Sequence, residues 1–189
     1  MSSHHLARLT GILYAINFAI GITAMVWTGQ GHAAAADRMN LAGGIEYALV
    51  VVLIGRLFQD AEPVFSWLVA AIGLVGCAIG AAGALHLFGS TATALVVFGA
   101  YCIALGTLVL RSALMPRFVG VLLILGGVGW LSYADLALAR SLQPYNIAGG
   151  IVGELVFTLW LLVFAVREPA QYQFGPNIPS RSKVGYSSK

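Results

Sequence analysis

Residues 64–89 read VFSWLVAAIGLVGCAIGAAGALHLFG, and none of them is Asp, Glu, Lys or Arg. A helix rises about 1.5 Å per residue, so about twenty apolar residues cross the roughly 30 Å hydrocarbon core of a bilayer. The stretch lacks the alternation of apolar and polar residues that is typical of a membrane β-barrel strand. It therefore predicts a transmembrane helix.

The rest of the chain has the same character. Of its 189 residues, 59% are hydrophobic and 9% are charged, whereas soluble domains carry roughly 25% charged residues. A chain this short has too little interior to hide so much apolar surface from water. This composition excludes a disordered chain and a secreted disulfide scaffold. The net charge of +3 comes without a basic, aromatic-interleaved stripe, so no nucleic-acid partner is expected.

Five further segments carry the same apolar signature, with Gly- and Pro-containing breaks between them. The predicted fold class is therefore all-α, a polytopic membrane bundle of six transmembrane helices. The predicted spans are 9–27, 41–58, 64–89, 90–111, 118–139 and 147–167, within a transmembrane domain 1–167. Only Gly89 and Ser90 separate the third span from the fourth, so a tight turn is expected there.

The basic residues predict the orientation of the bundle. With the N-terminus inside, eight of the ten Lys and Arg residues fall on the cytoplasmic side, and only Arg38 and Arg140 fall outside. Cytoplasmic loops of membrane proteins carry an excess of Lys and Arg residues, so both termini are expected in the cytoplasm. The polar segment 168–189 would then be a cytoplasmic tail, either packed on the inner face of the bundle or docking a partner.

Two hairpins have similar sequences. The first and fifth spans open with Arg-x-x-Gly (residues 8–11 and 117–120), and the second and sixth open with Ala-Gly-Gly-Ile (residues 42–45 and 148–151). The order is that of a parallel repeat of hairpins 1–2 and 5–6; chance similarity of Gly-rich sequence is the alternative. Glycines are also frequent within the spans, and Gly76-x-x-x-Gly80 is typical of a closely packed helix face, within the bundle or between copies.

Apart from the arginines at their cytoplasmic ends, the predicted spans contain four His, Asp or Glu residues, all in the outer half of the bilayer: Glu46, His86, Asp135 and Glu154. Placing such a side chain in a membrane costs about 2.5–3.5 kcal/mol of free energy or more, so each of these residues is expected to have a structural or functional role there. Glu154 shares a helix face with small and polar residues and is expected to point into the bundle. A purely structural role, or for His86 and Asp135 an interfacial position, is the alternative.

Three further polar side chains, Asn17, Tyr14 and Tyr101, could reach the same interior as ligand-binding residues or as interhelical hydrogen bonders. Tyr47, beside Glu46, is expected to point elsewhere on its helix. Together these groups suggest a polar pocket with Glu154 as central acid or anchor, Glu46 as its partner, and Asp135 and His86 at the rim.

Acid–base chemistry on a lipid-like substrate would suit such a pocket, because burial can keep one carboxyl protonated while another is ionised. Hydration, epoxide opening, isomerisation and cyclisation are all compatible with it, and so is proton-coupled transport. The Glu-x-x-His and His-x-x-x-His spacings of metal sites are missing, so neither a metal nor a cofactor is expected.

Short motifs along the chain resemble those of a bacterial six-span membrane family, domain of unknown function 4386. They are Arg8-x-x-Gly11-x-x-Tyr14, Leu114-x-Pro116-Arg117-x-x-Gly120, and Gly153-Glu154 followed by Trp160-Leu161-Leu162. The resemblance implies the six-span fold and a bacterial inner-membrane location, with Glu46 at a position where members often carry an acid. Members also often have Arg and an acidic residue in the third span, where this chain has Gly73, Leu74 and Gly76. The resemblance supplies no reaction.

The sequence thus leads to a membrane protein that binds a small amphipathic or lipid-like molecule in an outward-facing polar pocket, and whether it is an enzyme stays open. A small proton-coupled transporter is one alternative. The other is an accessory subunit of a larger membrane complex; a homo-oligomer is compatible with each of these functions.

Overall fold

The structure is a computed structural model that describes residues 3–88 and 91–166. This part of the chain is helical and contains no strand, in agreement with the predicted all-α class. Its elements are α1 (Ser3–Gly29), α2 (Ala33–Phe58), α3 (Pro63–Ala84), α4 (Thr91–Ser112), α5 (Arg117–Leu131), the 3-10 turn η1 (Ser132–Ala134), α6 (Leu136–Leu142) and α7 (Tyr145–Val163). Six of them are long and apolar enough to cross a membrane, namely all but η1 and α6.

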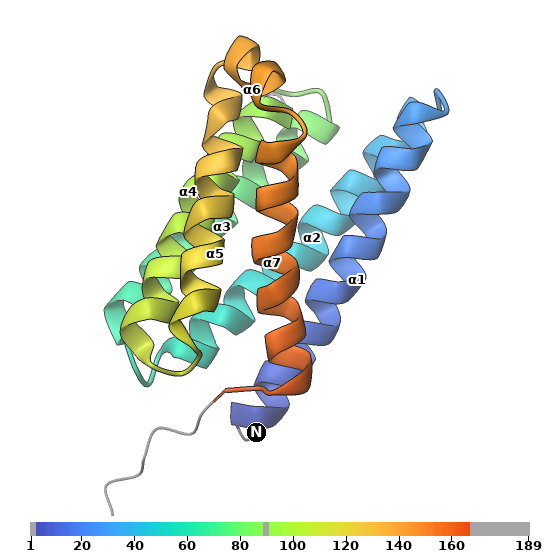
Figure 1. The fold of residues 1–189 in the computed structure, drawn as a ribbon. Coiled ribbons are helices and arrows are strands. Elements are labelled where there is room, and N and C mark those ends of the chain that lie inside the picture. The colour runs from blue at the N-terminus through green and yellow to red at the C-terminus, as the bar shows by residue number, and fades with distance from the viewer. Residues whose placement is uncertain (1–2, 89–90, 167–189) are drawn as a thin grey trace, which may run out of the picture.

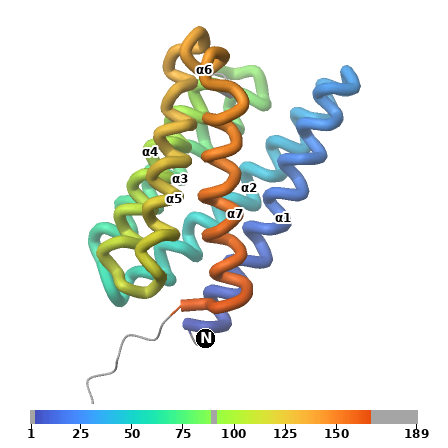
Figure 2. Tube along the Cα trace, viewed as in Figure 1, coloured from blue at the N-terminus to red at the C-terminus, as the bar shows by residue number. Residues whose placement is uncertain are grey.

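The six long helices form a closed ring. Each packs against the next along the chain, with α5 contacting α7, and α7 returns to contact α1 (Figures 1 and 2). Near the N-terminus α1 and α7 lie close together, because Gly11 lets the backbone of α1 approach Leu161 and Leu162. Toward the other end of the bundle α1 leans away from α7 (Figure 1).

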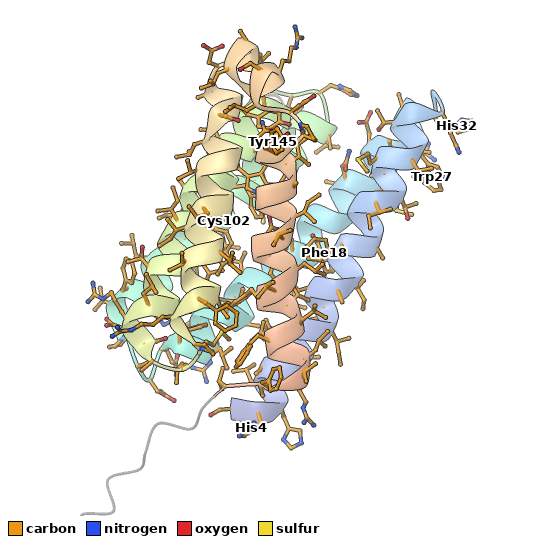
Figure 3. All side chains as sticks on the ribbon, viewed as in Figure 1. His4, Phe18, Trp27, His32, Cys102 and Tyr145 are labelled. Atoms are coloured by element: carbon orange, nitrogen blue, oxygen red, sulfur yellow. The ribbon has the colours of Figure 1, made fainter. Side chains whose placement is uncertain are left out.

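The two ends of the bundle carry different segments. The N-terminus and the end of α7 lie at one end, and the α1–α2 turn and α6 lie at the other, which we call the distal end (Figure 1). Trp27 and His32 mark the distal end of the first hairpin, Tyr145 marks the distal end of α7, and His4 marks the opposite end (Figure 3).

Glycines bring α4, α5 and α7 into backbone contact. A Cβ on Gly106 would lie 2.5 Å from the carbonyl oxygen of Gly120, and one on Gly153 would lie 2.5 Å from that of Leu122. Only a residue without a side chain permits these approaches. The close helix packing expected from the glycine content is therefore present on this side of the ring.

The glycines of α3 are different. A Cβ on Gly76 would approach only Val97 Cγ1 at 3.5 Å, and one on Gly80 only Ala94 Cβ at 3.9 Å, both ordinary van der Waals distances. The prediction that Gly76-x-x-x-Gly80 is a tightly packed face within the bundle was wrong. These glycines leave space beside α4 instead of closing it.

Several of the long helices begin or end away from the boundaries of the predicted spans. The second helix begins at Ala33, the third ends at Ala84, and the fifth ends at Leu131. Asp135 explains the last of these, because its Oδ1 accepts the backbone N–H groups of Ala137 at 2.8 Å and Leu138 at 3.3 Å and so begins α6. The expected Gly89–Ser90 turn and the tail 168–189 lie outside the described residues.

Candidate functional site

A cavity of about 330 Å³ lies between α1, α2, α3 and α4 in the distal half of the bundle. Its lining runs along α2 from Asp37 to Tyr47, which at about 1.5 Å per residue is roughly 15 Å of helix. Asp37 lies near the distal end of this path, whereas Tyr47 and Tyr101 lie near the middle of their helices. The cavity is thus an elongated space that reaches toward the bundle centre.

Glycines create this space. Gly73, Gly76, Gly80 and Gly83 follow one another at intervals of three or four residues on α3 and line one wall. Gly44 lines the cavity from α2, and a Cβ added to it would meet no atom within 4 Å. At Gly44, Gly76 and Gly80 an added Cβ would make no contact shorter than 3.5 Å, so side chains at these positions would extend into the space. Gly73 differs, because a Cβ there would lie 2.9 Å from the Tyr101 ring, so it lets α3 and α4 pack closely at the inner end of the cavity.

Asn17 joins the cavity wall to Glu46. Asn17 lines the cavity, and its Nδ2 donates to Gly43 O at 2.9 Å and to Glu46 Oε2 at 2.8 Å. The other carboxyl oxygen, Glu46 Oε1, is buried and has no hydrogen-bond partner among the described residues. A buried polar atom without a partner is costly and calls for an explanation.

Three aromatic side chains, Tyr47, Phe98 and Tyr101, line the cavity near the bundle centre. Their ring centroids lie 5.7 to 6.2 Å apart, so they form one cluster. Tyr101 is 0% exposed, and its hydroxyl has no hydrogen-bond partner within the described part of the chain. This is the second buried polar atom without a partner among the described residues, and Tyr101, unlike Glu46, lines the cavity.

Glu154 lies behind the cavity wall rather than in it. It is 7% exposed, its Oε2 accepts from the Tyr14 hydroxyl at 3.2 Å, and its Oε1 accepts from Trp130 Nε1 at 3.0 Å. Tyr14 in turn accepts from the Tyr47 hydroxyl at 2.9 Å. Glu154 is therefore connected to the cavity through Tyr14 and Tyr47, and both of its carboxyl oxygens are already bound.

His86 and Asp135 lie outside the six long helices, although both were expected within spans. His86 follows α3, its side chain is 79% exposed, and its Nε2 pairs with Asp37 Oδ2 at 3.1 Å. Because Asp37 lines the cavity, this pair lies at the distal end of the cavity, which we call its mouth. Asp135 is an exposed helix cap, which accounts for its polarity without a functional role.

The predicted residues therefore form two groups. Asn17 and Glu46 form one, and Tyr14 and Glu154 belong to the other, while Tyr101 lines the cavity between α3 and α4. Across residues 3–88 and 91–166, no three His, Cys, Asp or Glu side chains are grouped so that they could hold a metal ion.

Sequence reasoning missed Tyr47, Asp37 and Trp130. Tyr47 follows Asn40 by seven residues and Gly43 by four, which places all three on one face of α2, and this spacing could have found it. Asp37 lies outside the predicted span 41–58, so its charge gave no signal of a site within the bundle. Trp130 carried no signal, since its partner Glu154 is on another helix.

A family model matches residues 90–165, and its description is domain of unknown function (DUF4386). The matched region runs through α4, α5, α6 and α7 and includes Glu154, while Glu46 lies outside it. No curated protein and no solved structure matches the chain. The match and the six candidate membrane helices confirm the resemblance to an uncharacterised six-span family.

Proposed function

We propose that this membrane protein binds a small amphipathic molecule in the cavity between α1, α2, α3 and α4. The observation that carries the proposal is a glycine-lined space whose wall includes Tyr101, a buried residue whose hydroxyl lacks a partner among the described residues. Glu46 Oε1, which also lacks a partner, lies behind the lining residue Asn17. Binding sites for small molecules are concave, mostly apolar and equipped with a few polar groups. At about 330 Å³ the cavity is near the lower end of their size range.

The lining suits a ligand with one polar and one apolar part. Ile20, Leu95 and the glycines of α3 offer an apolar wall, and Asn17, Tyr47 and Tyr101 offer polar atoms near the bundle centre. A purely apolar ligand would leave those atoms unsatisfied, and a fully polar ligand would lie against the apolar wall.

The distal end of the bundle faces the outside in this proposal. The end that carries the N-terminus also carries four arginines, and basic residues favour the cytoplasmic side; they are Arg8, Arg56, Arg111 and Arg117.

Cysteine labelling tests this orientation in a background without Cys77 and Cys102. An impermeant maleimide should label Gln30→Cys in intact cells and Ser3→Cys only after lysis; the reverse pattern would place the cavity mouth in the cytoplasm.

Glu154 is a positioning residue in this proposal. Its oxygens hold Tyr14 and Trp130, and Tyr14 holds the hydroxyl of Tyr47 at the cavity wall. A ligand would therefore meet Tyr47 and not the carboxyl group itself.

Filling the cavity tests the proposal. Gly80→Leu places a side chain in the cavity, where the Cβ itself is tolerated, whereas Gly149→Leu adds the same side chain at an exposed position with nothing within 4 Å. Three six-carbon probes, hexan-1-ol, hexylamine and hexanoate, would be titrated into the purified protein in nanodiscs. At least one should bind the wild type and Gly149→Leu and fail to bind Gly80→Leu. The proposal is overturned when no probe binds, or when Gly80→Leu binds every probe as the wild type does.

A further inference from the structure

Two of the polar side chains that line the cavity, Asn17 and Tyr47, have already used their hydrogen-bond donors. Asn17 uses both of its amide hydrogens, toward Gly43 O and Glu46 Oε2, and Tyr47 donates its single hydroxyl proton to Tyr14. What these two residues can still offer is the Asn17 carbonyl oxygen and the lone pairs of Tyr47 Oη. Glu46 Oε1 also has no partner among the described residues, but Glu46 is not a lining residue and contributes its charge from behind Asn17. A ligand group that meets the Asn17 carbonyl oxygen or Tyr47 Oη must itself donate a hydrogen bond.

The charges around the cavity favour a cation. Asp37 lines it, Glu46 lies one hydrogen bond behind Asn17, and no Lys or Arg is among the lining residues in the described part of the chain. His86 pairs with Asp37 at the mouth, but its side chain is 79% exposed, and it is not among the residues that line the cavity. Carboxylate or phosphate ligands would face like charges without a compensating base.

The aromatic cluster also favours a cation. The rings of Tyr47, Phe98 and Tyr101 line the cavity near the bundle centre, and ring faces attract ammonium groups. The hydroxyl of Tyr101, 0% exposed and without a partner among the described residues, can accept a hydrogen bond there and can also donate one.

We infer that the ligand is a small amphiphile whose polar group is a protonated amine. The inference rests on the proposed binding function and specifies its substrate class. The ammonium group lies near Asn17, Tyr47 and Tyr101, where its N–H groups meet the remaining acceptors. The alkyl part lies along the glycine wall of α3.

An ammonium group can come from a free amine or from an ethanolamine lipid headgroup. The lipid headgroup also carries a phosphate, for which the described lining supplies no Lys or Arg. A free amine is therefore the assigned source.

The same three probes test the inference, because they share a six-carbon chain and differ in the polar group. In phosphatidylcholine nanodiscs, hexylamine should bind about tenfold more tightly than hexan-1-ol, as expected for a hydrogen bond to a charged group, and hexanoate should bind most weakly. Glu46→Gln, which removes the charge and keeps the shape, should weaken hexylamine about tenfold and leave hexan-1-ol unchanged. Tyr101→Phe should weaken hexylamine without lowering the stability of the empty protein.

The outcomes separate the inference from the binding function. Equal affinity for hexylamine and hexan-1-ol, both lost in Gly80→Leu, would overturn the amine and leave the binding function standing. If none of the three probes binds the wild-type protein, both the amine inference and the binding function are overturned. Replacing half of the lipid with phosphatidylethanolamine should leave hexylamine binding unchanged; competition by that lipid would support ammonium recognition and overturn the free-amine source.

Discussion

Trp130 Nε1 donates a hydrogen bond of 3.0 Å to Glu154 Oε1 and so joins α5 to α7 inside the bundle. The contact depends on Gly150, one turn before Glu154, because a Cβ there would lie 2.3 Å from the Trp130 ring. An indole N–H can only donate and a buried carboxyl needs partners, so each group satisfies the other. The position of Glu154 therefore depends both on this hydrogen bond and on the close packing of Gly150 against the Trp130 ring.

Gly150→Ala should therefore destabilise the protein, by about 1–3 kcal/mol as is typical of overpacking. The methyl group must displace the Trp130 ring and with it the hydrogen bond to Glu154. The matched control is Gly149→Ala, since a Cβ on Gly149 meets nothing within 4 Å. Thermal unfolding in detergent measures both; equal melting temperatures for the two variants would contradict the close Trp130 contact.

Loss of the hydroxyl group should lower the stability of the protein at Tyr14 but not at Tyr101. Tyr14→Phe removes the donor to Glu154 and the acceptor of Tyr47, so it should cost about 1–3 kcal/mol of unfolding free energy. Tyr101→Phe removes a buried hydroxyl that has no partner among the described residues, so stability should be unchanged or slightly higher. Denaturant unfolding of the two variants side by side decides this, and a large loss in Tyr101→Phe would reveal a partner for its hydroxyl.

The two cysteines should differ in accessibility. Cys77 lines the cavity, whereas Cys102 is 1% exposed and belongs to the core. A cationic 2-aminoethyl methanethiosulfonate should modify Cys77 faster than the anionic 2-sulfonatoethyl reagent and leave Cys102 unmodified, as intact-protein mass spectrometry would show. Gly80→Leu should slow the reaction of Cys77, with Gly149→Leu as control. Modification of Cys102 in the folded protein, or no effect of Gly80→Leu, would argue against access through the cavity.

His86→Ala should affect access to the cavity more than stability. The pair with Asp37 is at an exposed position, so its loss should cost less than about 1 kcal/mol. Removal of the imidazole uncovers Asp37 at the mouth, and the cationic reagent should then reach Cys77 faster than in the wild type. An unchanged labelling rate would mean that the pair does not restrict entry.

Much of the fold could be predicted because lipid imposes simple requirements. Residues 64–89 and five similar segments satisfy the length and apolarity of a membrane span, and each corresponds to a long helix. The ends of these helices were less predictable. Asp135 ends the fifth span early by capping α6, and such a cap depends on local backbone geometry that hydropathy does not report.

The candidate site was predictable only in part. Glu46, Asn17, Tyr14 and Glu154 stood out in the sequence because a polar group in an apolar span needs a reason. Their partners did not stand out: Trp130, Tyr47 and the glycine wall of α3 belong to other helices and look like ordinary core residues. The sequence by itself determined that these polar groups must lie inside a six-helix membrane bundle. Only the tertiary structure decided that Glu154 is enclosed by Trp130 and Tyr14 while Asn17 and Tyr101 border a cavity, because contacts between helices depend on how each helix is rotated and tilted against its neighbours.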